Sequence, residues 1–197
     1  MHLNRILCGL ALAVPSMAQV SWVQWTSGSG ANSHYYAITP VSLTSPAQES
    51  YAVSLGAHLV SINSAQEQAF LNAVFGTSAQ YWIGFNDAAV EGTWKWTDRS
   101  SGSWSASSPG IFAFWAPGEP NDYAASSLSE DYAVMNWNSS GEWNDIFATE
   151  SRFGIIEATS IPEAGHAGLT GGALVLAAGL YAGRARFFNR AGNRDRS

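Results

Sequence analysis

The chain has 197 residues, a mass of 21.0 kDa and a formal net charge of −6 at pH 7, and this length allows one domain of ordinary size with short segments at its ends. Between positions 19 and 161, three basic residues stand against thirteen acidic ones, which disfavours nucleic acids and anionic surfaces as partners. Surface charge is normally mixed in sign. A cluster of carboxylates with so few Lys or Arg residues to balance it therefore indicates a bound metal ion more than an ordinary solvated surface.

Residues 1–18 have the pattern of a signal peptide. A basic residue, an apolar run and the small residues Ser16 and Ala18 follow one another in the order that signal peptidase prefers, so the exported chain is expected to start at Gln19. The alternative is a short buried helix. Cys8, the one cysteine of the chain, lies within the apolar run. The exported domain is therefore expected to fold without disulfides, with its many aromatic residues supplying core area.

Residues 19–158 contain strand patterns. Short aromatic runs bounded by Gly, Ser and Asn predict strands, and they lie at positions 22–25, 34–38, 81–85, 93–96, 131–137 and 152–157. Long polar loops separate the later runs, and loops of that length inside a compact domain usually carry a function. The sequence of the Ser-rich stretch 99–110 does not predict which secondary structure it forms or where it runs.

Two helices are predicted between the second and third of these strands. Ser45 is expected to cap the first helix, with Pro46 in its first turn and a glycine after its end. Ser64 and Glu67 form the capping-box pattern of the second helix, which ends before Gly76. Helices and short strands in one domain predict an α+β fold.

The segment 115–145 concentrates oxygen-bearing side chains. Its members are Glu119, Asn121, Asp122, Glu130, Asp131, Asn144 and Asp145. Carboxylates and side-chain amides, without Cys or His among them, match the six to eight oxygen ligands that Ca²⁺ prefers and argue against zinc, copper or iron. The sequence therefore predicts a calcium site.

These residues, in order and spacing, resemble the C-type lectin domain. The motifs that carry the resemblance are Glu119-Pro120-Asn121, Glu130-Asp131 and Trp143-Asn144-Asp145, together with the stretches 56–62, 81–85 and 91–98. The resemblance covers most of residues 32–158. It implies an α+β fold for residues 19–158, with two helices flanking small antiparallel β-sheets and a long loop that carries the ligand site. The chain departs from the animal members in lacking their half-cystines, and Tyr132 stands where one of them is expected.

The resemblance also implies a role for each residue of the main site. Glu119, Asn121, Glu130, Asn144 and Asp145 are expected to hold Ca²⁺, and the first four are expected to contact the sugar. Two vicinal sugar hydroxyls can replace water on the ion, while each hydroxyl donates to a carboxylate and accepts from an amide. The peptide before Pro120 is expected to be cis. The order Glu-Pro-Asn implies mannose-type sugars rather than galactose.

A second calcium ion is expected from the same resemblance. Asp87, Glu91, Asp122 and Asp131 match the family's auxiliary ligands position by position. For Asp87 the alternative is an ordinary turn residue, because Asx turns are frequent.

The C-terminus resembles the bacterial PEP-CTERM sorting signal that an exosortase recognises. Residues 159–164 form a linker that contains Pro162, Glu163 and Ala164, with Ala164 in place of the second proline. The apolar run 165–183 is long enough to span a bilayer, and the basic tail 184–197 is expected to remain cytoplasmic. The resemblance implies an exported bacterial protein, held at the cell surface or released, whose precursor is anchored in the membrane.

Three functions are compatible with these patterns. The first is non-enzymatic, calcium-dependent binding of mannose-type glycan or exopolysaccharide. The second is a glycoside hydrolase that uses Glu119 and Glu130 as its acid and base. The third is a protein-binding or matrix-structuring module that does not bind sugar. His58 and the indoles of Trp115 and Trp143 are expected to be core residues, and the oligomeric state stays open.

Overall fold

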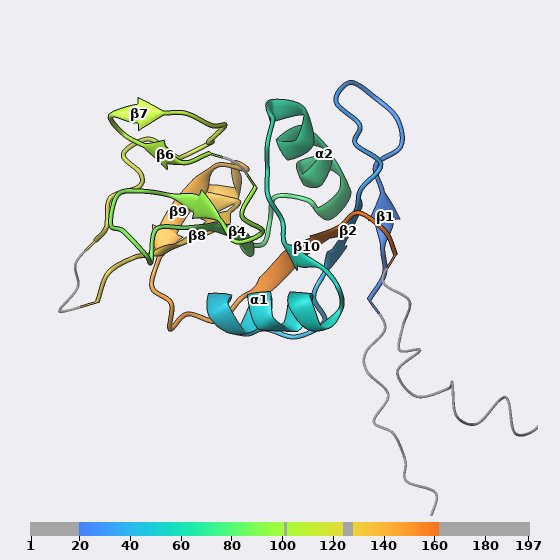
Figure 1. Cartoon of the computed structure of the whole chain (residues 1–197), viewed down its shortest axis with the longest axis horizontal. Helices are drawn as coiled ribbons and strands as arrows, with labels where there is room; N and C mark the ends of the chain where they lie inside the picture. Colours follow the sequence, from blue (N-terminus) through green and yellow to red (C-terminus); the bar gives the residue numbers. More distant parts are fainter. Residues whose placement is uncertain (1–19, 101, 124–127, 162–197) are drawn as a thin grey trace, which may run out of the picture. The chain divides into compact units, whose positions relative to one another are not determined.

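The computed structural model describes residues 20–100, 102–123 and 128–161 (Figure 1). The signal peptide predicted at 1–18, the apolar run at 165–183 and the basic tail at 184–197 lie outside the described residues. The same is true of positions 162–164 of the predicted linker. In the part of the chain that the structure describes, no helix has the length and apolar character needed to cross a membrane.

The main sheet passes through the whole domain. Its strands in spatial order are β1 (Val23–Gln24), β2 (Tyr35–Ile38), β10 (Phe153–Ala158), β4 (Tyr81–Asn86), β8 (Tyr132–Met135) and β9 (Trp143–Ile146). Two further strands pair at its sides, β3 (His58–Leu59) with β10 and β5 (Lys95–Trp96) with β4. The sequence patterns predicted most of these strands, but not β3 or β9.

One pairing differs from the expected antiparallel sheets. Strands β10 and β4 run parallel, with Phe153 opposite Tyr81 and Gly154 opposite Trp82. The chain between them is long and contains the β8 and β9 pair. A connection of that length lets the last strand enter the sheet beside the start of β4, whereas a short turn would have made the pair antiparallel.

The two predicted helices are present as α1 (Ser45–Ser54) and α2 (Ala65–Phe75). Helix α2 starts as expected, because Oγ of Ser64 accepts from the backbone N–H of Glu67 at 3.1 Å. The prediction for α1 was wrong by one residue. Its N-cap is Thr44, which makes no side-chain capping hydrogen bond. Gln48, three residues after Ser45 and so in the capping-box position, does not cap the helix either: its side chain donates to the carbonyl oxygens of Val41 and Arg152 at 2.7 Å each.

The central strands have one apolar layer on each face. Two neighbouring residues of β10 belong to different layers. Ile155 packs in the cluster that contains Leu71 of α2, and Ile156 packs in the cluster that contains Ala52 of α1. Successive side chains of a strand point to opposite faces. The helices therefore cover opposite faces of β10, as Figure 1 shows for α1 and α2.

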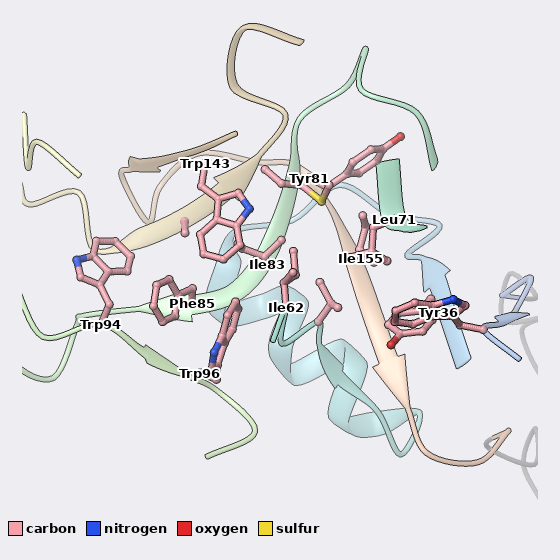
Figure 2. Close-up of a cluster of buried hydrophobic side chains, with 14 residues drawn as sticks. Tyr36, Ile62, Leu71, Tyr81, Ile83, Phe85, Trp94, Trp96, Trp143 and Ile155 are labelled. Carbon is pink, nitrogen blue, oxygen red and sulfur yellow. The ribbon is translucent and has the colours of Figure 1, made fainter. Parts of the chain in front are cut away.

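Large aromatic side chains fill the end of the core that lies under the long loop. We call Phe85, Trp94, Trp96, Trp115 and Trp143 the aromatic cluster. Ring centroids are 4.3 Å apart for Phe85 and Trp96, and 5.8 Å apart for Trp115 and Trp143. Figure 2 shows the buried rings of this group beside Ile83 and Ile62. Trp143 is fully buried and Trp115 half-buried, so the expectation that these two indoles belong to the core is confirmed.

Packing takes the place of a disulfide at Tyr132. This residue lies opposite Ile146 in the antiparallel pair of β8 and β9. Its ring meets that of Trp82 edge-on, with centroids 6.5 Å apart. Edge-to-face pairs of this kind are worth about 0.5–1.5 kcal/mol beyond the area that they bury. The contact thus ties the hairpin that carries Asn144 and Asp145 to the core.

The environment of His58 on β3 differs from expectation. His58 is exposed, and its Nδ1 lies 2.6 Å from Oε1 of Glu49, so the prediction of a core histidine was wrong. His58 points outward on β3 while Leu59 faces inward.

The Ser-rich stretch 99–110, which the sequence left unassigned, forms a small hairpin of β6 (Trp104–Ser105) and β7 (Ser108–Pro109). A short 3₁₀ helix, η1 (Trp137–Ser139), joins β8 to β9.

Candidate metal and sugar site

The start of β9 fixes the first half of the long loop. The backbone N–H of Ala116 donates to the carbonyl oxygen of Trp143, and the N–H of Trp143 donates to that of Phe114, both at 2.8 Å. A tight turn follows, in which the N–H of Glu119 donates to the carbonyl oxygen of Ala116 at 3.0 Å. The Glu119–Pro120 peptide is cis, as the resemblance implies. Glu119 is thereby carried next to the strand that bears Asn144 and Asp145.

Asp145 is the centre of the predicted main site. It is fully buried, its Oδ1 accepts from the backbone N–H of Asn121 at 3.2 Å, and its Oδ2 accepts from that of Asp122 at 2.8 Å. Glu130 performs a similar role, because its Oε2 accepts from the N–H of Tyr123 at 3.0 Å. The loop backbone is therefore held by carboxylates of the site itself. We refer to Glu119, Asn121, Glu130, Asn144 and Asp145 as the sugar-site cluster.

The carboxylates of this cluster lie near enough to perturb one another. Burial raises the pKa of Glu119 to about 7, and the charges of Asp145 and Glu130 add to the effect. Burial also raises the pKa of Glu130, assisted by Asp145 and Asp122 and opposed by the hydrogen bond from Tyr123. Negative charge is thus disfavoured here unless a cation compensates it.

Several buried oxygens of the predicted ligands have no hydrogen-bond partner. They are Oε2 of Glu119, Oδ1 of Asn144 and Oδ1 of Asp87. Asn144 is 4% exposed, and its Nδ2 donates to the backbone oxygen of Asp145 at 2.7 Å, which leaves its Oδ1 free. A buried acceptor without a donor costs about 1–3 kcal/mol. Oxygen ligands of this kind fit a hard cation such as Ca²⁺.

A second acidic group lies beside the first. One carboxylate oxygen from each of Asp87, Glu91 and Asp131 lies within 4.8 Å of the other two, and we call these three residues the auxiliary cluster. Burial raises the pKa of Asp87 to about 7, the N–H of Gly92 lowers it, and the charge of Glu91 raises it further. The fourth predicted ligand, Asp122, is adjacent to the group: its Oδ1 and Oε2 of Glu91 both contact Oγ of Ser129.

Asp87 combines the backbone of a turn residue with a buried carboxylate. Its backbone oxygen accepts from the N–H of Val90 at 2.9 Å, as in a turn. Its carboxylate is 3% exposed, with Oδ2 accepting from the N–H of Gly92 at 2.8 Å and Oδ1 without a partner. The turn therefore places the buried carboxylate of Asp87 close to those of Glu91 and Asp131.

Of the nine predicted ligands, five form the sugar-site cluster and three the auxiliary cluster, while Asp122 contacts Asp145 through its backbone N–H and Ser129 through its Oδ1. One residue that sequence reasoning missed is Ser129, which contacts the carboxylates of Glu91 and Asp122 at 2.9 and 2.8 Å. The residue type alone does not distinguish it, because serines are frequent throughout this segment. Its position beside Glu130 was the one available signal.

The fold and the comparisons agree on the class of protein. The family model for the lectin C-type domain matches residues 43–155, and the chain belongs to the C-type lectin domain family. Human C-type lectin domain family 17, member A is 38% identical over 110 residues, which is 56% of this chain and 24% of that protein. The chain thus matches about a quarter of that relative's length.

Solved structures give the same result. The carbohydrate-recognition domain of the mouse scavenger receptor C-type lectin is 25% identical, with a TM-score of 0.57, and the match covers 77% of this chain and 99% of that one. The cow carbohydrate-recognition domain of CD23, crystallised in the presence of a GlcNAc2Man3 oligosaccharide, is 26% identical, with a TM-score of 0.56 and coverage of 75% and 96%. The domain therefore has the α+β fold of C-type lectins.

Proposed function

We propose that this domain binds carbohydrate through a Ca²⁺ ion held by the sugar-site cluster. The observation that carries the proposal is the pair of oxygens without donors, Oε2 of Glu119 and Oδ1 of Asn144, beside the buried carboxylate of Asp145. A bound Ca²⁺ would supply the missing positive charge and open coordination positions for two sugar hydroxyls. The likeness to a CD23 domain crystallised with a GlcNAc2Man3 oligosaccharide supports a glycan ligand.

The carboxylates and amides of the sugar-site cluster would make different hydrogen bonds to the sugar. Glu119 and Glu130 accept hydrogen bonds from the two sugar hydroxyls, while the amides of Asn121 and Asn144 donate hydrogen bonds to them. Asn144 uses one of its amide hydrogens on the backbone oxygen of Asp145, and its second amide hydrogen remains for the ligand. The Glu119, Pro120, Asn121 order favours mannose-type sugars with equatorial vicinal hydroxyls.

A second ion would occupy the auxiliary cluster. Asp87, Glu91 and Asp131 provide its carboxylates, and Asp122 lies close enough to join them through a small movement of its side chain. Support comes from the unpartnered Oδ1 of Asp87, which is buried among like charges. This ion would hold the loop after β4 to the long loop.

The raised pKa of Glu119 also bears on the hydrolase alternative, because a general acid needs a value near 7. An acid and base pair requires environments that push the two pKa values apart. Burial and like charges raise the pKa of both Glu119 and Glu130. Their direction alone does not separate the two alternatives. The buried carboxylate of Asp145 and the unpartnered oxygen of Asn144 beside them favour a cation-binding site over a catalytic pair, in agreement with the generally non-enzymatic family to which the chain belongs.

The place of action is proposed from the sequence alone. The signal peptide at 1–18 supports export, and the sorting-like segment 159–164 with its apolar run supports display at the cell surface or release from it. Many copies on one surface would raise the apparent affinity of a shallow site.

Titration calorimetry of the exported chain with methyl α-mannoside tests the proposal. Heat is expected with calcium and none after chelation, and methyl α-galactoside should compete poorly. Glu130→Gln should abolish binding, whereas the matched change Glu150→Gln, at an exposed ion pair with Arg152, should leave it unchanged. Calcium-independent mannoside binding, or turnover of an aryl mannoside, would refute the proposal.

A further inference from the structure

Two imidazoles lie on either side of β10, close to its end. His58 of β3 stands opposite Glu157 in the antiparallel pair of β3 and β10. His34 directly precedes β2, which pairs with the other side of β10, and its Nδ1 lies 2.5 Å from Oε1 of Glu157. The sheet therefore brings two residues that are 24 positions apart in the chain to the same end of one strand.

Each of these imidazoles is oriented by a carboxylate that the backbone holds in place. Glu157 faces Nδ1 of His34 with Oε1, and its Oε2 accepts from the backbone N–H of Ser61 at 3.2 Å. Glu49 faces Nδ1 of His58 with Oε1 at 2.6 Å, and its Oε2 accepts from the next backbone N–H of β3 at 2.8 Å. An ionised carboxylate only accepts hydrogen bonds, so each Nδ1 carries the proton. The neutral ring then presents its Nε2 as an acceptor.

Both histidines line one pocket, whose volume is about 400 Å³, within the usual range for small-molecule sites. Asp98, in the turn after β5, lines the same pocket. Its Oδ1 accepts from the backbone N–H of Ser100 at 2.8 Å, which leaves Oδ2 for a ligand. The lining includes the carboxylates of Asp98 and Glu157 and neither Lys nor Arg. The pocket therefore offers negative charge together with acceptor atoms.

The spacing of these acceptors restricts what the pocket can hold. In the part of the chain that the structure describes, the auxiliary cluster is the one group of three metal-ligating side chains whose atoms lie within 4.8 Å of one another. The acceptors of His34, His58 and Asp98 are therefore too far apart to share one metal ion, since zinc needs ligands at about 2 Å. A single ammonium group could not reach all three either. A larger cation with several N–H or O–H groups can.

We propose that this pocket is a second binding site, which takes a small organic cation with a primary ammonium group and further donors, either an amino sugar or a diamine. The ammonium group pairs with the carboxylate of Asp98, and the other donors reach Nε2 of His34 and of His58. Neither the sugar-site cluster nor the auxiliary cluster contributes a residue to the lining. Binding at the second site therefore needs no calcium, and the domain could hold two ligands at once.

Titration calorimetry of the complete exported chain in chelator tests the site, because chelation silences any sugar binding through calcium. D-glucosamine represents the amino sugars and putrescine the diamines, and heat from one or both is expected. N-acetyl-D-glucosamine lacks the charge and should bind at least tenfold more weakly. Asp98→Asn keeps the acceptor for the Ser100 N–H and should weaken amine binding about tenfold, the effect of losing one charged hydrogen bond. The exposed control Glu150→Gln should change nothing.

Long-range ¹H–¹⁵N NMR spectra locate the bound amine. The Nε2 signals of His34 and His58 should shift on titration, and His58→Gln should weaken binding without unfolding the domain, because its side chain is exposed. Equal affinity for N-acetyl-D-glucosamine, unchanged affinity in Asp98→Asn, or unshifted ring signals would overturn the proposal. So would ring shifts with zinc chloride and none with either amine. Glu130→Gln should retain amine binding, so failure of the second site leaves the proposed calcium function intact.

Discussion

Replacing Asp87 by Asn distinguishes two effects of the auxiliary cluster: the loss of stability that its crowded carboxylates cause without calcium, and the stability that it gains when calcium binds. The Asp87 carboxylate is 3% exposed and its pKa is raised from 3.8 to about 7, chiefly by burial. Each tenfold change in proton affinity corresponds to about 1.4 kcal/mol, which gives a ceiling of about 4 kcal/mol for the charged form. Glu91 is exposed and solvent screens its charge, so the expected destabilisation is nearer to about 2 kcal/mol.

The direction in which stability changes with pH follows from which state of the chain, folded or unfolded, keeps the proton of Asp87. Because the folded pKa of Asp87 lies above its unfolded value, the folded chain keeps a proton that the unfolded chain loses. In chelator, the free energy of unfolding should therefore fall as pH rises from about 4 to about 7, and remain low above that range. The raised pKa of Glu119 acts in the same direction. Calcium should remove this dependence, because it binds the ionised forms.

Asp87→Asn keeps the shape of the side chain and removes its charge. In chelator at about pH 7.5 the variant should be more stable than the wild type by about 2 kcal/mol, with little difference at about pH 4.5. In excess calcium the order should reverse, since the wild type gains binding free energy that the amide reduces. Urea denaturation followed by far-ultraviolet circular dichroism provides the measurement.

Glu150→Gln is the matched control. It breaks an exposed ion pair with Arg152 at 3.1 Å, a contact worth about 0–1 kcal/mol, and its effect should be the same with calcium and with chelator. A variant Asp87→Asn that is less stable than the wild type in chelator at neutral pH would refute the electrostatic reasoning. So would a wild-type stability that does not change between the two pH values.

Three further outcomes are expected. Glu119→Gln combined with Asn121→Asp exchanges donor and acceptor on one side of the sugar, so competition assays should move from mannose toward galactose with calcium binding retained. Gly84→Ala should destabilise the domain by about 2 kcal/mol or more in urea denaturation, because an added Cβ would lie 2.7 Å from the backbone oxygen of Leu59 and from Oγ1 of Thr97. Deletion of residues 165–197 should release the domain into the soluble exported fraction, as fractionation and immunoblotting would report; membrane retention would refute the anchor.

Much of the fold is predictable because local signals and tertiary packing agree. Ser64 caps α2 through its hydroxyl, and the aromatic run at 81–85 becomes β4, as its pattern indicates. The signals fail where a distant contact decides. Gln48 has the spacing of a capping residue, but it binds a carbonyl oxygen of Arg152, 104 positions away. Strand β9 is built from the polar Asn144 and Asp145, whose strand form depends on pairing with β8.

The sequence predicts which residues belong to the candidate site, but not the contacts between them. The candidate ligands stand out in the sequence because carboxylates and amides recur in the order of a known family, and the structure places Asp87, Glu91 and Asp131 close together. Ser129 was not among the predicted ligands, and its contact with Glu91, 38 positions away, arises only in the folded chain. The raised pKa of Glu119 is likewise invisible in the sequence, because burial and the neighbouring Asp145 cause it.

The aromatic cluster gives this domain a built-in optical reporter. Trp143 is fully buried, stacks edge-on against Trp96 and Trp115, and directly precedes Asn144 and Asp145 in β9. The emission of an indole shifts with the electric field across its ring, and a divalent charge placed a few residues away changes that field strongly in an apolar surrounding. Closely packed indoles also pass excitation among themselves. The domain can therefore signal, without any attached label, whether its neighbouring carboxylates carry an ion.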